Sequence, residues 1–336
     1  MKESTTSGTP ASAGMALHDS TPGSNRATTA KRGLLAGVFR LSDPRISLAS
    51  VASMFLGACA AAQEGPLQAG WLALTVLGVL AIEVAKNASG EVFDFASGAD
   101  LGVASKDRTR FSGGKRVLVD GLLTKRQTVA VAAVGYFLGA AVGLWIVFFR
   151  EPRVLWFGLV GMGAAFFYHA PPLKLSYRGL GEAAVGVCYG PLISCGTYLV
   201  QRGTVTVDVL WLSLPLGLSI AAFLWINEFP DVTADREAGK RTLVVRLGRR
   251  RAGRVYVAIL GLAYAILAVL PLAGLPPAVW LGAAGIVPAA SAARRLLASP
   301  ETTARVIPAQ ERTLVAFLLL AFGSGLGLLL AGKRIV

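Results

Sequence analysis

Long apolar stretches alternate with polar connections along most of this 336-residue chain. A helix needs about twenty mostly apolar residues to cross a bilayer, and nine stretches come close to that length or reach it. The fourth and the eighth stretches are short for a full crossing. We predict an all-α integral membrane protein, a bundle of about nine transmembrane helices. The predicted spans are residues 46–62, 70–85, 128–149, 154–167, 181–200, 207–229, 255–272, 276–293 and 314–331.

Composition supports the same fold class. Hydrophobic residues make up 54% of the chain and charged residues only 15%, and the mean hydropathy is +0.59. A soluble globular domain is less apolar and more highly charged. Cys59, Cys188 and Cys195 all fall within apolar stretches and lack the spacing of a metal site or a disulfide framework, so we interpret them as packing residues.

The distribution of positive charge predicts the membrane topology. The formal net charge is +14, but the cations lie between apolar stretches and not in one compact patch, which argues against nucleic-acid binding. Cytoplasmic loops retain Lys and Arg. We therefore expect the N-terminal tail and the loops that carry the catalytic motifs to be cytoplasmic. The cation-rich loops are residues 86–127, 168–180, 230–254 and 294–313, whereas 63–69 and 273–275 contain no Lys or Arg.

The N-terminal region differs in composition from the rest. We expect residues 1–40 to form a disordered cytoplasmic tail, because the first thirty are rich in Ser, Thr, Gly and Ala and lack the apolar core of a secretory signal. Residues 41–336 then form the transmembrane domain. Nine crossings place the C-terminus, with Lys333 and Arg334, on the opposite side, which is a small exception to the charge rule.

The most distinctive polar stretch, residues 227–248, follows the sixth span. Asn227, Asp231 and Asp235 recur every four residues, so their side chains would share one face of a helix. Lys240 and two arginines come soon after. Carboxylates at the end of an apolar span, followed by fixed positive charge, are typical of a divalent metal that holds a phosphorylated ligand at a membrane surface.

The loop after the second span repeats this order of acids before cations. If the second helix continues into the loop, Asn87, Glu91 and Asp94 lie on one face, and Asp100 follows. Mg²⁺ binds carboxylate and phosphate oxygens together, so the two clusters could hold a diphosphate between them. Either cluster alone would be explained more simply as a solvated helix end. The matched pair favours a joint site.

Two further features affect this site. The loop 168–180 carries Lys174 and Arg178, which either reach an anionic ligand or merely follow the positive-inside pattern. His169 is better explained as a hydrogen-bonding loop residue than as a metal ligand. Pro230 either kinks the sixth helix, which would turn the carboxylates toward the bundle interior, or simply ends it.

Three motifs resemble those of a known family. They are FDFASGAD with the later SGGKRVLVDGLL, then PPLKLSYRGLGE, and most specifically NEFPDVTADREAGKRTLVVRLG. Through them, residues 40–335 resemble the UbiA superfamily of intramembrane prenyltransferases, particularly the branch that prenylates 1,4-dihydroxy-2-naphthoate in menaquinone synthesis. The resemblance implies a nine-helix bundle with a lateral opening to lipid. It also implies two aspartate-rich motifs that bind Mg²⁺, expected as two ions, and an allylic diphosphate.

The resemblance assigns roles by position. Its catalytic acids would be Asp94, Asp100, Asp231 and Asp235, and these four with Glu91 would be the metal ligands. The family's first motif usually opens with Asn-Asp, whereas Gly90 and Glu91 stand there in this chain. Asn87, one turn earlier, could substitute for the lost contact. The expected diphosphate ligands are Asn87, Arg108, Lys174, Arg178, Asn227 and Lys240.

The implied reaction is Mg²⁺-dependent transfer of a prenyl group from an allylic prenyl diphosphate to an aromatic or quinone-precursor acceptor. Charge on the departing diphosphate is stabilised by the metal and the cations, and the apolar bundle keeps water from the carbocation. Two alternatives stay open. One is a UbiA-type terpene cyclase, in which the substrate's own double bonds capture the cation, and the other is a membrane transporter with an acidic cation site.

Overall fold

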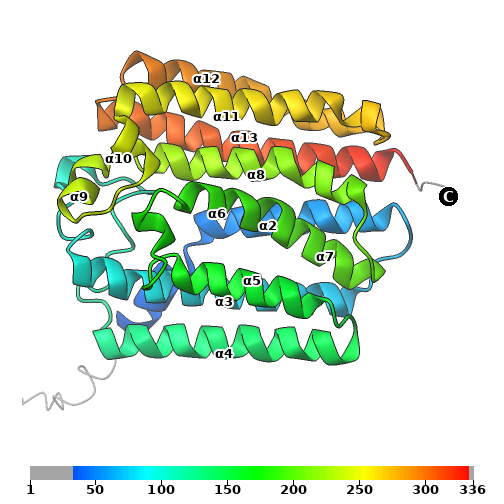
Figure 1. Cartoon of the computed structure of the whole chain (residues 1–336), viewed down its shortest axis with the longest axis horizontal. Coiled ribbons are helices and arrows are strands. Elements are labelled where there is room, and N and C mark those ends of the chain that lie inside the picture. Colours follow the sequence, from blue (N-terminus) through cyan, green and yellow to red (C-terminus); the bar gives the residue numbers. More distant parts are fainter. Residues whose placement is uncertain (1–32, 333–336) are drawn as a thin grey trace, which may run out of the picture.

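The computed structural model describes residues 33–332, which are helical with no β-strand among them. The long helices run side by side, and their connections lie at the two ends of the bundle (Figure 1). After a first helix, Gly33–Ser42, the main α-helices are α2 Pro44–Ala62, α3 Ala69–Ser97, α4 Lys125–Phe149, α5 Val154–Phe167, α6 Gly181–Val187, α7 Ile193–Arg202, α8 Val207–Asn227, α9 Val232–Glu237, α10 Leu243–Leu247, α11 Arg249–Val269, α12 Ile286–Ala298 and α13 Thr303–Leu330. Short 3-10 or π segments are η1 Ser105–Asp107, η2 Leu175–Tyr177, η3 Cys188–Leu192, η4 Leu270–Ala273 and η5 Pro277–Gly285.

All nine predicted spans are helical, which confirms the fold class. Seven continuous helices are long and apolar enough to cross a membrane. The other two spans are the fourth and the eighth, the two of uncertain length. The fourth is α5, with 14 residues. The eighth consists of a nine-residue 3-10 helix, η5, followed by the 13-residue α12.

Local sequence explains where several of these helices begin. The Thr124 hydroxyl accepts a hydrogen bond from the Gln127 backbone N–H at 3.2 Å, in a capping box that opens α4. The Thr206 hydroxyl accepts one from the Val209 N–H at 3.4 Å before α8. Pro44 occupies the first turn of α2, where its missing N–H leaves no bond unmade. These residues therefore set the helix starts near the edges of the apolar stretches.

The fifth span changes its helical pitch in the middle of the bundle. The π-helical turn η3 contains Pro191 and joins α6 to α7, so that the two form one 22-residue span, Gly181–Arg202. Cys188 and Tyr189 in this turn line an apolar cavity. Single π turns within α-helices often occur at functional sites.

The first helix moves the boundary of the predicted tail. Residues 33–40 are helical, so the expected tail of residues 1–40 extended too far by these positions. Leu41 is fully buried, whereas Leu35 and Phe39 are exposed. Residues 1–32 lie outside the described part of the chain, as do Lys333 and Arg334.

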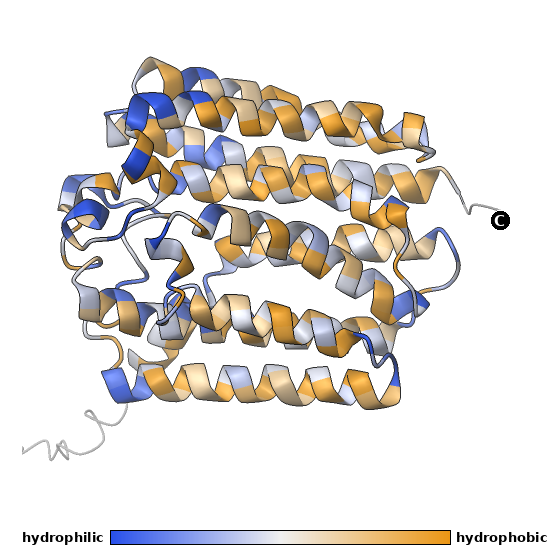
Figure 2. Ribbon diagram, viewed as in Figure 1, coloured by the Kyte–Doolittle hydropathy of each residue, from blue (hydrophilic) through white to orange (hydrophobic). Residues whose placement is uncertain are grey.

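Hydrophilic residues gather at one end of the bundle, where the connections that follow α3, α5 and α8 meet (Figure 2). Arginines at the opposite end have structural partners. The Nε of Arg150 donates to the Val200 carbonyl at 2.8 Å, and the Nε of Arg202 donates to the Ala61 carbonyl at 2.7 Å. Both carbonyls belong to the last turn of a helix, where positive charge is favourable.

Candidate active site

The first acidic cluster lies on the last turns of α3. As the sequence predicted, this helix continues beyond its apolar part to Ser97. Asn87, Glu91 and Asp94 are therefore brought to one side of it, and all three line a polar cavity of about 190 Å³. Asp100 follows the helix and lines the same cavity.

The second acidic cluster lies on a broken helix. α8 ends at Asn227, Pro230 lies in the following turn, and Asp231 directly precedes α9. Of the two outcomes left open for Pro230, the structure has the end of the helix, so Asn227 and Asp231 do not share the face of one continuous helix. Asp231 and Asp235 line the polar cavity, whereas Asn227 does not.

Lys240 connects the two clusters electrostatically. Its Nζ lies 3.7 Å from Asp94 Oδ2 and 3.6 Å from Asp235 Oδ1. Burial alone would lower the pKa of Lys240, but the carboxylates of Asp235 and Asp94 outweigh burial and hold it well above its usual range. Tyr177 adds a neutral contact, since its hydroxyl donates to Asp94 Oδ1 at 2.8 Å.

His169 fills the space above Gly90. A Cβ at position 90 would lie 2.6 Å from His169 Cε1, so a larger residue there would displace the ring. The Nε2 of His169 lies 3.5 Å from Asp94 Oδ2. Burial lowers the pKa of His169 to about 4, so the imidazole is neutral at pH 7. The glycine that replaces the usual residue of the first motif at position 90 therefore makes room for His169 of the loop 168–180.

Several buried carboxylate oxygens in the cavity lack a hydrogen-bond partner in the described part of the chain. They are Glu91 Oε2, Asp100 Oδ2 and Asp231 Oδ1. The second oxygen of Asp231 accepts from the Gly113 N–H at 3.0 Å, and that of Glu91 from the Leu118 N–H at 2.9 Å. Burial, reinforced by neighbouring carboxylates, raises the pKa of Asp100 to about 8 and that of Asp231 to about 7. Such oxygens suit a cation that replaces their protons.

The charge of the cavity wall also suits a divalent cation. Among the described residues, no three His, Cys, Asp or Glu side chains converge into a ready-made metal site. Mg²⁺ usually binds one or two carboxylates and completes its shell with water and phosphate oxygens, so these residues fit Mg²⁺ that arrives with a diphosphate. The wall carries six carboxylates, Asp43, Glu91, Asp94, Asp100, Asp231 and Asp235, and three basic side chains, Arg110, Lys115 and Lys240.

Four of the expected diphosphate ligands lie outside this wall: Arg108, Lys174, Arg178 and Asn227. The Nε of Arg108 donates to the Val103 carbonyl at 3.1 Å within its own loop. The Nζ of Lys174 lies 5.3 Å from the centroid of the Tyr177 ring. Asn87 does line the cavity, but its amide donates to the Leu41 carbonyl at 2.9 Å. Of the predicted basic ligands, only Lys240 is in direct contact with the acidic clusters.

The sequence did not single out several contributors to the site. The Gly113 N–H and the Tyr177 hydroxyl each bind a motif aspartate, and Lys115 pairs with Asp43. The two successive glycines, 113 and 114, were the feature of the sequence that could have indicated a close approach of the backbone to the acidic residues. Both have positive φ, 86° and 72°, and Gly114 lies so close to the Asp100 carboxylate that a Cβ would overlap it.

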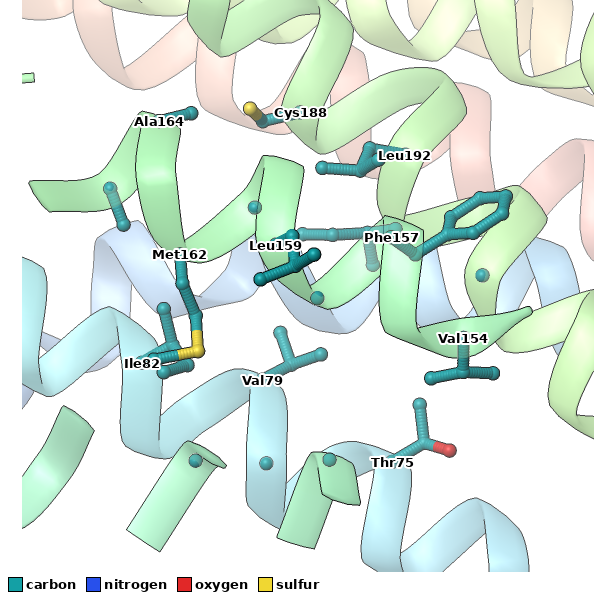
Figure 3. A pocket seen from close by; sticks show the side chains of 18 of the residues that line it. Thr75, Val79, Ile82, Val154, Phe157, Leu159, Met162, Ala164, Cys188 and Leu192 are labelled. Atoms are coloured by element: carbon teal, nitrogen blue, oxygen red, sulfur yellow. The ribbon is translucent and has the colours of Figure 1, made fainter. Parts of the chain in front are cut away.

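An apolar cavity of about 440 Å³ adjoins the polar one. Side chains of α3, such as Val79 and Ile82, and of α5, such as Phe157, Leu159 and Met162, surround it (Figure 3). The two cavities are lined by consecutive residues at two places. Lys86 and Tyr168 line the apolar cavity, while Asn87 and His169 line the polar one.

The apolar cavity reaches the outer surface between α4 and α5. Its lining residues Leu144, Leu155 and Leu159 are 45%, 37% and 54% exposed. Exposed apolar side chains on a membrane-spanning bundle face lipid hydrocarbon. A ligand with a long apolar chain could therefore extend from this cavity into the bilayer.

A comparison with known families decides the identity. The sequence profile described as the UbiA prenyltransferase family matches residues 50–320. The chain belongs to this family. It is thus a prenyltransferase of the UbiA type, which confirms the family that the three motifs indicated.

Curated relatives of this UbiA protein cover most of its length. The UbiA prenyltransferase domain-containing protein 1 of Dictyostelium discoideum is 28% identical over 239 residues, which is 68% of this chain and 69% of that protein. The 1,4-dihydroxy-2-naphthoate octaprenyltransferase of Bacillus subtilis is 22% identical over 248 residues, covering 74% and 78%.

Solved structures of the family share the fold. A structure described as digeranylgeranylglyceryl phosphate synthase has a TM-score of 0.59 at 12% identity, covering 88% of this chain and 98% of the other. A UbiA homologue from Archaeoglobus fulgidus bound to GPP and Mg²⁺ has a TM-score of 0.57 at 14% identity, covering 86% and 99%. At these identities the likeness concerns the fold alone.

Proposed function

We propose that this prenyltransferase transfers a prenyl group from an allylic prenyl diphosphate to an aromatic or quinone-precursor acceptor in a Mg²⁺-dependent reaction. The observation that carries the proposal is the junction of an acidic cavity with an apolar one. A prenyl diphosphate has the same division, with a charged head and a hydrocarbon tail. The Mg²⁺ and GPP of the A. fulgidus homologue and the name of the B. subtilis relative support this assignment.

The acidic and the basic residues of the polar cavity would have different roles in binding the diphosphate. Glu91, Asp94, Asp100, Asp231 and Asp235 would hold the metal, and Lys240 would keep the two acidic clusters together. Bound Mg²⁺ would supply positive charge to the departing diphosphate. The bond between the allylic C1 and oxygen breaks, and its electron pair leaves with the diphosphate.

The apolar cavity would hold the prenyl chain and keep water from the allylic cation. A π electron pair of the acceptor ring forms the new bond between a ring carbon and C1, and the hydrogen on that ring carbon then leaves as a proton, which the released diphosphate accepts. Exclusion of water is necessary because water would otherwise capture the cation. Most side chains of the cavity, such as Val79 and Phe157, are hydrocarbon and offer no atom that could capture the cation.

Alanine substitutions at the two acidic clusters test the proposal. We expect Asp94→Ala and Asp231→Ala each to reduce Mg²⁺-dependent diphosphate release on the order of a hundredfold or more, as is typical when charge stabilisation is removed. Asp120→Ala is the matched control, because Asp120 is exposed and binds Arg40 outside the cavity. Release that survives in both motif variants would overturn the metal assignment.

The terpene cyclase alternative is tested with the same membranes and no acceptor. The wild-type protein should then form little product, and addition of an aromatic acceptor should yield a prenylated ring, detected by mass spectrometry. A cyclic hydrocarbon or alcohol as the main product without acceptor would overturn the transferase proposal. Prenyl diphosphates of several lengths should be offered in parallel.

A further inference from the structure

Two charged residues in the wall of the apolar cavity have no part in the function proposed above. Glu83 and Lys86 lie on α3, Glu83 inside the predicted span 70–85 and Lys86 directly after it, and both line the cavity. Glu83 is only 4% exposed. Ionisable residues within a bilayer are expensive to bury, and they commonly mark a functional site.

Each carboxylate oxygen of Glu83 accepts a hydrogen bond from a neutral hydroxyl group. The Ser50 hydroxyl donates to Glu83 Oε2 at 2.8 Å, and the Tyr189 hydroxyl donates to Glu83 Oε1 at 3.1 Å. These hydroxyls come from α2 and from the π turn η3, so three separate elements converge here. The arrangement fixes the Tyr189 hydroxyl relative to α3.

Lys86 retains capacity for another ligand. Its Nζ donates to the Tyr189 hydroxyl at 3.1 Å and lies 5.5 Å from the centroid of the Tyr189 ring. An ammonium group has three donors, and no other hydrogen bond or ion pair of this Nζ occurs within residues 33–332. Lys86 is half-buried, and it faces a cavity whose other lining is almost entirely apolar.

Lys86 lies at the end of the apolar cavity that is next to the polar cavity, because Asn87 and Gly90 on the same helix line the polar cavity. Gly90 lines the polar cavity and lies four residues further along α3, which is about 6 Å along the helix axis. The allylic C1 is bonded directly to the diphosphate, so it must lie near the junction of the cavities. An acceptor ring in contact with C1 would then lie beside Lys86.

We propose that Lys86 binds an anionic oxygen of the aromatic acceptor, either a carboxylate or a phenolate, and that Glu83 and Tyr189 hold Lys86 in position. The inference rests on the proposed transferase function. The chemical reason is that an ammonium in an apolar cavity gains most from a ligand that brings the opposite charge.

The test compares two acceptors in Lys86→Met, Lys86→Arg and wild-type protein. The probes are 1,4-dihydroxy-2-naphthoate and 1,4-dihydroxynaphthalene, offered with Mg²⁺ and the prenyl diphosphate that gives the highest wild-type rate. We expect Lys86→Met to raise the acceptor KM roughly 10- to 100-fold and Lys86→Arg to restore part of the affinity. The KM for the prenyl diphosphate should stay within about twofold, because Lys86 lies outside the polar cavity. Lys106→Met, in an exposed loop, is the matched control.

The two acceptors distinguish which oxygen Lys86 binds. An increase in KM for the naphthoate alone identifies the carboxylate as the bound group, and an increase for both probes identifies a phenolic oxygen. An unchanged acceptor KM in Lys86→Met, or a loss that appears only as weaker prenyl diphosphate binding, would overturn the inference and leave the proposed function intact. A wild-type protein that prenylates no aromatic acceptor would instead overturn the proposed function itself.

Discussion

At the scale of single residues, Gly114 allows the first loop to close on Asp100. Its φ is 72°, and a Cβ there would overlap the Asp100 carboxylate. We predict that Gly114→Ala reduces Mg²⁺-dependent diphosphate release on the order of 10- to 100-fold, because small displacements of binding groups have effects of that size. Kinetic measurements on purified protein check the loss.

Gly121→Ala is the control for this variant. Gly121 also has a positive φ, 66°, but a Cβ there would meet open space. The backbone penalty of about 1 to 2 kcal/mol is thus shared, and only the contact with Asp100 differs. Equal losses of activity in the two variants would show that the contact at Gly114 is unimportant.

The raised pKa values of Asp100, about 8, and Asp231, about 7, predict how metal binding depends on pH. Without metal, the folded protein keeps protons that the unfolded chain releases, so the stability contributed by these protons falls as pH rises above about 4 and is lost once the pH passes the folded-state pKa values of about 7 and about 8. Mg²⁺ must displace the same protons. The increase in Tm on adding Mg²⁺ should therefore grow from about pH 5.5 to about pH 8.

Thermal unfolding in detergent, with Mg²⁺ or with a chelator, measures this increase. Asp100→Asn should flatten its pH dependence, because the substituted amide has no proton to release to the metal. Glu237→Gln is the control, since Glu237 is exposed at the end of α9 and lies outside the polar cavity. An increase in Tm that is the same at every pH would contradict the prediction.

At the scale of helices, contact between α8 and α6 depends on Gly217. A Cβ at Gly217 would lie 2.5 Å from the Gly186 carbonyl oxygen, so the two backbones touch. We predict that Gly217→Ala destabilises the protein by about 1 to 3 kcal/mol through overpacking. Gly261→Ala in α11 is the matched control. It faces open space and should be neutral or stabilising by about 0.5 to 1 kcal/mol.

Equilibrium unfolding of both glycine variants in mixed micelles measures this difference. The helix pair matters for the site because α8 leads directly into Asp231, and the span that begins with α6 carries Tyr189. Gly217→Ala should therefore also lower activity. A Gly217→Ala protein as stable as Gly261→Ala would mean that the helices separate without cost.

At the scale of the whole molecule, the polar end that contains the motifs should face the cytoplasm. In a protein whose three cysteines are replaced by alanine, single cysteines at Lys106 and at Leu67 report the two ends, since both positions are exposed. An impermeant maleimide should label Leu67→Cys in intact cells and Lys106→Cys only after permeabilisation. The reverse pattern would invert the proposed orientation.

Particular residues show how far the sequence could predict the site. The spacing of Asn87, Glu91 and Asp94 correctly indicated that α3 extends past its apolar part, because helical periodicity is a local property. From Pro230 the sequence could not tell a kinked helix from a helix that ends, and in the structure the helix ends before it. Arg108 and Lys174 matched cationic parts of the motifs but lie outside the cavity wall, because side-chain direction in a loop depends on the tertiary path of the chain.

The sequence by itself determined the all-α membrane fold, the positions of the nine helical segments and the two acidic clusters. These follow from the cost of burying polar groups in a bilayer, which each segment must meet on its own. Only the tertiary structure decided that Lys240 lies between Asp94 and Asp235, that His169 packs over Gly90, and that Lys86 lies where the two cavities adjoin. Contacts between distant segments depend on how the helices pack together, and helix packing leaves no local pattern in the chain.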